Sequence, residues 1–103
     1  MLNNWDSAVA ETSTGKPYDD KPIDIGRFLR KFDKDIDDNE LIWHRDKRSR
    51  VITVMSGEDW KLQFDDLLPV TLEKNKQYKI PKETYHRILK GKGNLILEIR
   101  EEE

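Results

Sequence analysis

The sequence contains no cysteine and only a small excess of one charge, and each absence removes a class of function. Without cysteine, the chain has no disulfide, no thiolate metal ligand and no cysteine nucleophile. The 19 basic and 21 acidic residues leave a net charge of -2, which gives no broad attraction to nucleic acid or to an anionic membrane. No apolar run approaches membrane-spanning length, and the first residues lack the pattern of a signal peptide. We therefore expect a soluble, cytoplasmic protein.

What the chain does contain is dense, mixed charge around a modest set of apolar residues. Charged residues make up 39% of the sequence and hydrophobic residues 35%. A chain of 103 residues can bury one core of moderate size but not two. We therefore expect a single domain over residues 1–103.

The N-terminal third divides into two segments of different composition. Residues 1–21 include a stretch rich in Ser, Thr, Gly, Pro and Asp, which is typical of a flexible arm. Over residues 24–36, basic side chains separate apolar residues that recur at helical spacing: Ile25, Phe28, Leu29, Phe32 and Ile36. Asp24 is a suitable N-cap for such a segment. The pattern predicts a short amphipathic helix over 24–36 that packs against the rest of the chain.

From residue 40 onward the pattern indicates short β-strands separated by turns. Residues 51–55 are rich in β-branched side chains, and residues 60–64 alternate between apolar and polar. The predicted strands are 41–43, 51–55, 60–64, 70–72, 78–80, 85–89 and 95–99. No segment of helical length interrupts them, so residues 40–100 are expected to form an antiparallel sandwich or barrel. The predicted fold class is all-β with one N-terminal helix.

Two segments of this β region carry polar residues and turn residues at regular spacing. They contain, in order, His44, Asp46, Arg50 and Gly57, and then Asn75, Pro81, Glu83, His86 and Lys90. The spacing resembles the two motifs of the cupin family, which run His-x-His, Glu, Gly and then Gly, Pro-x-Gly, His, Asn. The residue types agree at only some positions. The resemblance covers roughly residues 40–100 and implies an antiparallel β-barrel or jelly roll.

The resemblance also implies where a metal would bind. Metal-binding cupins use three histidines and a glutamate, and here His44 and His86 occupy the first and last of these positions. Asp46 replaces the second histidine, and Arg50 replaces the glutamate. Two imidazoles and a carboxylate form the ligand set of the non-haem iron facial triad and also suit Mn, Ni or Zn. A guanidinium stays charged and cannot coordinate a cation, but it could grip an anionic substrate.

Two turn positions of the family pattern also differ in residue type. Asn75 occupies a position where the family has glycine, and asparagine can still adopt a left-handed conformation. Glu83 replaces a second glycine, which predicts a turn of different shape.

Three interpretations of the cluster of His44, Asp46, Arg50 and His86 stay open. The first is a divalent-metal site. The second is a metal-free pocket in which Asp46 pairs with Arg50 and a small polar or anionic molecule binds beside them. The third is structural, with the histidines satisfied by neighbours and the Asp46–Arg50 pair an ordinary salt bridge. A fold alone does not choose among these functions.

Five residues are further candidates for contact with a ligand: Trp43, Arg48, Arg50, Trp60 and Gln63. An enzyme built on this site would be a metal-dependent oxygenase, isomerase or lyase acting on a small polar substrate. Either histidine could alternatively act as a general base, because imidazole titrates near neutral pH. The competing class is a non-enzymatic binding or structural protein. Open sheet edges invite a second chain, so a homodimer is expected, with no nucleic-acid or membrane partner.

Overall fold

The computed structural model describes residues 17–102, in which strands joined by loops make up nearly all of the regular secondary structure. The elements are β1 (Asp19–Asp24), β2 (Arg27–Phe32), the 3-10 turn η1 (Asp38–Glu40), β3 (Ser49–Glu58), β4 (Lys61–Phe64), β5 (Val70–Thr71), β6 (Gln77–Ile80), β7 (His86–Leu89) and β8 (Lys92–Glu102). Over these residues, no helix is long and apolar enough to cross a membrane. The predicted predominance of β-structure is confirmed.

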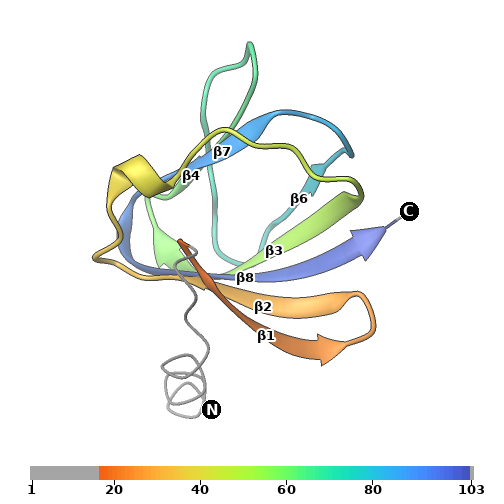
Figure 1. The fold of residues 1–103 in the computed structure, drawn as a ribbon. Helices are drawn as coiled ribbons and strands as arrows, with labels where there is room; N and C mark the ends of the chain where they lie inside the picture. Colours follow the sequence, from red (N-terminus) through yellow and green to blue (C-terminus); the bar gives the residue numbers. More distant parts are fainter. Residues whose placement is uncertain (1–16, 103) are drawn as a thin grey trace.

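The strands form two antiparallel sheets that face each other. The larger sheet has the order β1-β2-β8-β3-β6, and the smaller has the order β5-β4-β7. In Figure 1, β4 and β7 lie above β8, β2 and β1, with the core between the two layers. The chain passes repeatedly from one sheet to the other, so strands that follow each other in sequence, such as β3 and β4, often lie in different sheets. This pattern is consistent with a jelly roll.

The core between the sheets is made by the inward side chains of alternating strand residues. The largest fully buried side chains are Trp60, Ile52, Leu62, Leu72, Leu95 and Val54. Burying one such side chain is worth about 1.5–3 kcal/mol, so these positions dominate the stability of the fold. Trp60 also satisfies its indole N–H, which donates to the carbonyls of Lys92 and Gly93, both at 3.2 Å.

The helix predicted over residues 24–36 is wrong, because this segment contributes to a β-hairpin. β1 and β2 pair antiparallel through a turn at Gly26, whose φ of 72° suits glycine. β2 then pairs along its whole length with β8, with Phe28 opposite Ile99 and Phe32 opposite Leu95. Apolar residues four apart share a face in a strand as well as in a helix, so Phe28 and Phe32 fitted both patterns.

Arg30 is the residue that concealed the strand period in the sequence. It lies between Phe28 and Phe32 on the same face of β2, and it is only 8% exposed. Its guanidinium makes two hydrogen bonds to Asp20 on β1, at 2.8 and 2.9 Å, and lies 3.5 Å from the centroid of the Tyr18 ring. A buried arginine needs such partners. Asp20 lies on the neighbouring strand β1, and Tyr18 directly precedes that strand.

The other strand predictions agree with the structure except at one place. Residues 41–43 form no strand, and only His44 after them makes an isolated bridge. Of the predicted flexible arm over 1–21, residues 1–16 lie outside the described part of the chain. Its last three residues, 19–21, belong to β1.

Candidate metal centre

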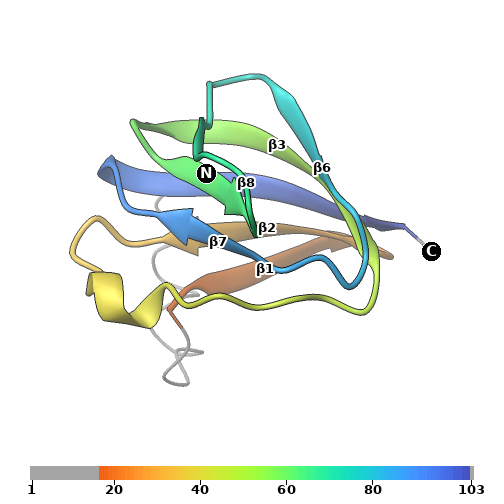
Figure 2. The ribbon, with the colours of Figure 1, turned by 90° about the horizontal axis from the view of Figure 1, so that it is seen from above.

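The two histidines are held side by side by backbone hydrogen bonds. The amide of His44 donates to the carbonyl of His86 at 3.0 Å, and the amide of His86 donates back to the carbonyl of His44 at 2.9 Å. Residues directly opposite in an antiparallel pair place their side chains on the same face. The ring centroids accordingly lie 4.4 Å apart. Figure 2 shows the segment that follows η1 running alongside β7, where His86 begins the strand.

Asp46 joins the histidines because it lies two residues after His44 in an extended segment. Alternate residues of such a segment share a face. The carbonyl of Asp46 accepts a hydrogen bond from the amide of Glu83 at 2.7 Å, which ties this segment to the turn before β7. One carboxylate oxygen of Asp46, Oδ2, lies 3.4 Å from Nε2 of His86. One potential ligand atom from each of His44, Asp46 and His86 lies within 4.8 Å of the others.

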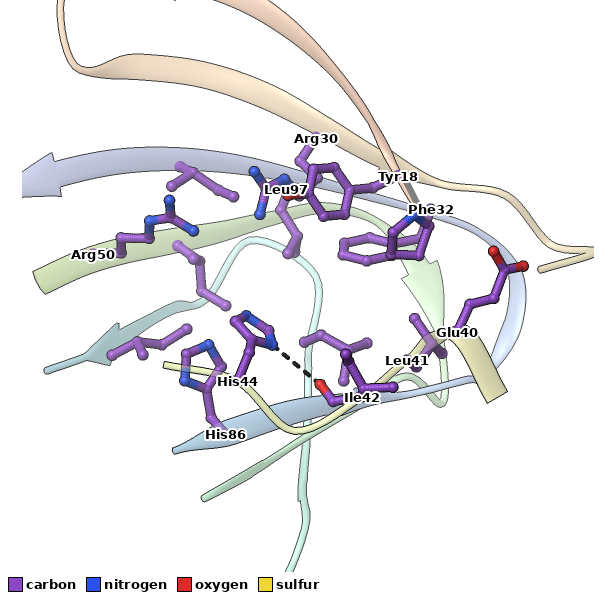
Figure 3. Close-up of a pocket in the computed structure, with 15 residues that line it drawn as sticks. Tyr18, Arg30, Phe32, Glu40, Leu41, Ile42, His44, Arg50, His86 and Leu97 are labelled. Atoms are coloured by element: carbon purple, nitrogen blue, oxygen red, sulfur yellow. Dashed lines mark hydrogen bonds between the residues drawn. The ribbon is translucent and has the colours of Figure 1, made fainter. Parts of the chain in front are cut away.

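The hydrogen bonds of the rings determine which nitrogen is available. Nδ1 of His44 lies 3.1 Å from the carbonyl oxygen of Ile42, and Nδ1 of His86 lies 2.8 Å from that of Thr84. A carbonyl only accepts, so in the neutral ring each Nδ1 carries the proton and each Nε2 has a free lone pair. Metal-ligating histidines are commonly oriented by such a bond. Figure 3 shows the bond from His44 to Ile42.

Burial keeps His86 neutral. Its side chain is 4% exposed, and this desolvation lowers the pKa of the imidazole below the usual 6.5. The nearby charges of His44 and Arg50 act in the same direction. The hydrogen bond to Thr84 and the carboxylate of Asp46 oppose them and do not reverse the shift. At neutral pH, His86 therefore presents a lone pair and not a proton toward Asp46.

Arg50 is the other cation beside Asp46, and its main partner is Glu101. Its Nε and Nη2 donate to Oε2 of Glu101 at 3.3 and 3.0 Å. Nη1 lies 3.4 Å from Oδ2 of Asp46, close enough for an ion pair but outside hydrogen-bond geometry. Oδ2 of Asp46 is consequently buried without any hydrogen bond. Such an atom is costly unless a cation or a proton donor satisfies it.

The donor set and this unsatisfied oxygen fit a divalent transition metal. Two unprotonated imidazole nitrogens and a carboxylate are ligands that Fe, Mn, Ni and Zn accept. The lone pair of His86 and Oδ2 of Asp46, 3.4 Å apart, are two acceptors that face each other with no proton between them. A cation placed among them would satisfy both. The charge of Arg50 opposes a second cation, but Glu101 offsets that charge from the other side.

A small cavity of about 70 Å³ adjoins the histidines. Its walls come from both sheets and are mainly apolar, with residues such as Ile52, Ile80, Ile88, Leu97 and Ile99. Figure 3 shows the guanidinium of Arg50 on the same side of this cavity as the two imidazole rings. Glu40 lines the opposite end. The cavity is therefore a mainly apolar space with Arg50 and the two histidines gathered at one end.

The structure places the remaining candidate ligand-binding residues away from this cavity. Trp60 is completely buried in the core. Gln63 bonds to the carbonyl of Leu67 and to Arg87 on the smaller sheet. Trp43 is 40% exposed and stacks with Arg87, whose guanidinium carbon lies 4.6 Å from the ring centroid. Arg48 is exposed.

Several residues important to the site were not singled out from the sequence. Glu101 lies 51 residues from Arg50, so no local spacing connects the two. Tyr18 and Arg30 line the cavity from a segment that was expected to be an arm and a helix. The carbonyls of Ile42 and Thr84 carry no sequence signal, because every residue has one. The one hint in the sequence is that Ile42 and Thr84 each lie two residues before a histidine.

The arrangement of the sheets is similar to that of several solved structures. A cupin-2 domain protein from Shewanella frigidimarina superimposes with a TM-score of 0.59 at 19% identity, covering 93% of this chain and 89% of that one. A chain from crystal structures of the DMSP lyases RdDddP and RnDddQII gives 0.64 at 13% identity, covering 75% of this chain. The Fe(II) form of HppE with the alternative substrate (S)-1-HPP gives 0.61 at 14% identity, covering 82% of this chain.

The extent of these matches differs between the small cupin and the enzymes. The present chain spans only 37% of the DMSP lyase chain and 48% of the HppE chain. No protein-family model matches the sequence, and no curated protein is significantly similar to it. The likeness is therefore one of fold. The chain has the cupin fold, and it carries a His44, Asp46 and His86 group whose ligand atoms are close enough for one metal ion.

Proposed function

We propose that this protein binds one divalent transition-metal ion through Nε2 of His44, Nε2 of His86 and the carboxylate of Asp46. The observation that carries the proposal is the convergence of these ligand atoms within 4.8 Å, next to a buried carboxylate oxygen that has no hydrogen bond. The Fe(II) form of HppE has a similar fold, so iron is the first metal to test. A bound ion would act as a Lewis acid and, with three protein ligands, would keep coordination positions open.

We further propose that the adjoining cavity takes a small molecule with one anionic group and an apolar body. Arg50 lines the cavity on the side of the histidines and can donate to a carboxylate or a similar anion. The isoleucine and leucine side chains of the wall would exclude water from the rest of the molecule. On such a substrate the reaction classes to examine are those of a metal-dependent oxygenase, isomerase or lyase.

Metal titration of tag-free protein tests the metal site. We expect stoichiometric binding of Fe²⁺ under anaerobic conditions, or of Mn²⁺, in isothermal titration calorimetry and elemental analysis. His44→Ala, His86→Ala and Asp46→Asn should each weaken binding by about 100-fold or more, because each removes a ligand. Asp65→Asn is the matched control, since Asp65 is an exposed carboxylate outside the cluster, and it should bind as the wild type does.

The same titration decides against the metal if no divalent ion binds and none raises the melting temperature.

One observation favours the metal-free alternative, namely the 3.4 Å approach of Arg50 to Asp46. In that case Asp46 and Arg50 would form a charge pair beside a pocket for a small polar or anionic molecule. Asp46→Asn would then lower stability, and the presence of Mn²⁺ would not change the size of that effect.

A further inference from the structure

Arg50 lies between two carboxylates and is bonded to only one of them. Nε and Nη2, which form one edge of the guanidinium, both donate to Oε2 of Glu101. The third nitrogen, Nη1, approaches Oδ2 of Asp46 to 3.4 Å without forming a hydrogen bond. The arginine is therefore oriented by Glu101, although Asp46 lies close enough to compete for it.

The position of Glu101 is set by the pairing of the two central strands. Arg50 on β3 and Glu101 on β8 are directly opposite each other in the antiparallel register. The amide of Glu101 also donates to the carbonyl of Gly26 at 2.8 Å, which anchors the end of β8. The ring of Phe28 adds a further contact, because the guanidinium carbon of Arg50 lies 5.8 Å from its centroid. The pairing of β3 with β8 therefore holds Arg50 and Glu101 next to each other.

The position of Arg50 determines whether Oδ2 of Asp46 is open to a metal ion. If Arg50 turned toward Asp46, its guanidinium would fill the coordination space of Oδ2 and satisfy that oxygen with a proton donor. We infer that Glu101 is a positioning residue, which holds Arg50 off Asp46 and so leaves the Asp46 carboxylate available to a divalent cation. This inference rests on the proposed metal site, and it assigns a role to a residue that would not itself contact the metal.

The neighbouring residue on β8 supplies a matched control. Glu102 makes only long ion pairs, to Lys79 at 3.6 Å and to Arg100 at 3.8 Å, and it does not contact Arg50. Glu101→Gln and Glu102→Gln therefore remove the same charge from adjacent positions of one strand. A general electrostatic effect on metal binding would appear in both variants, whereas a positioning effect would appear in Glu101→Gln alone.

Calorimetric titration of the full chain with Mn²⁺ measures the effect. Glu101→Gln is expected to weaken binding by about 10- to 100-fold, the range typical of residues that support a metal site without contacting the ion. Glu102→Gln should change the affinity by less than about threefold, because long, solvent-accessible ion pairs contribute little. Arg50→Gln should bind Mn²⁺ more tightly than wild type, and in that background Glu101→Gln should have no further effect.

A crystal structure of Glu101→Gln grown in EDTA gives a readout that does not depend on metal. We expect the guanidinium to have moved onto Asp46, within hydrogen-bond distance of Oδ2. An unmoved Arg50, or Mn²⁺ affinities equal in Glu101→Gln and wild type, would overturn the role of Glu101 and leave the metal site standing. A wild-type protein that binds no divalent ion would instead overturn the metal site, and with it the role of Glu101.

If Glu101→Gln does not fold alone, the comparison of Arg50→Gln with the double variant Arg50→Gln/Glu101→Gln still decides the question. Equal Mn²⁺ affinities are expected, because Glu101 acts through Arg50 under this inference. Weaker binding in the folded double variant would contradict it.

Discussion

At the scale of single residues, two turn positions where the second motif of the family has glycine are left-handed here although neither is glycine. Asn75 has a φ of 69° and Glu83 a φ of 58°, both in the left-handed region that glycine adopts freely. The expectation that Glu83 gives a turn of different shape from the family's stays a prediction. The amide of Glu83 donates to the carbonyl of Asp46 from this conformation, so the turn helps to place Asp46.

The left-handed glutamate leads to a stability prediction. A residue with a Cβ in this region costs about 1–2 kcal/mol relative to glycine, and Glu83 offsets that cost only by an exposed 3.7 Å contact with Arg45. Glu83→Gly should therefore stabilise the protein by about 1 kcal/mol in urea unfolding. Glu83→Ala keeps the Cβ and should give no such gain. Equal gains in both variants would mean that the side chain, and not the backbone, is responsible.

At the scale of elements, the β1–β2 hairpin shows how a charged residue can be part of a strand's inward face. Asp20 and Arg30 are paired residues of the two strands, and their side chains make two hydrogen bonds. Breaking such a pair costs more than breaking an exposed one, because Arg30 is largely removed from water and would keep an uncompensated charge. The hairpin also supplies Arg30 and Phe32 to the cavity wall.

Removing the partner of Arg30 tests this account of the hairpin. Asp20→Asn should destabilise the protein by about 1–3 kcal/mol, because a charge-assisted hydrogen bond is lost and a buried guanidinium keeps its charge. Glu73→Gln, which breaks the exposed pair with Lys76, should cost less than about 0.5 kcal/mol. Both values come from urea unfolding followed by tryptophan fluorescence. A similar, small cost in both would show that Arg30 is satisfied without Asp20.

At the scale of the whole molecule, the two sheets enclose one imidazole more completely than the other, and this has a consequence for stability. His86 is 3% exposed, and its pKa in the folded state lies below the usual 6.5. In the unfolded chain the ring takes up a proton near its ordinary pKa, whereas the folded protein resists protonation. The corresponding stability is therefore present above about pH 6.5 and is lost as the pH falls through the lower folded pKa.

Thermal unfolding in EDTA measures this dependence without metal. The melting temperature of the wild type should fall as the pH is lowered from 7.5 through the region below 6.5. His86→Gln should remove most of that slope, because the titrating ring is gone. His44→Gln is the comparison, since that ring is more accessible, and it should retain most of the slope. An unchanged slope in His86→Gln would show that other groups cause the dependence.

Much of the β-region was predictable from local pattern, and the failures have a common physical cause. Residues 51–55 and 95–99 alternate or are rich in β-branched side chains, and they lie within β3 and β8. The segment over 24–36 failed because spacing of four suits a strand as well as a helix, and only pairing with β8 decides between them. The expected homodimer stays a prediction, which β1 as an edge strand makes reasonable.

The sequence by itself determined the turn positions and the period-two strands after residue 50, because these depend on residue type and short spacing. Its resemblance to the cupin motifs named the three metal-ligand candidates, His44, Asp46 and His86. Tertiary structure alone decided that His44 and His86 pair with each other in an isolated antiparallel β-bridge and that backbone carbonyls orient their rings. It also decided that Glu101 holds Arg50. These contacts join residues far apart in the chain through backbone groups and strand register, and register is fixed only when the distant strands pair.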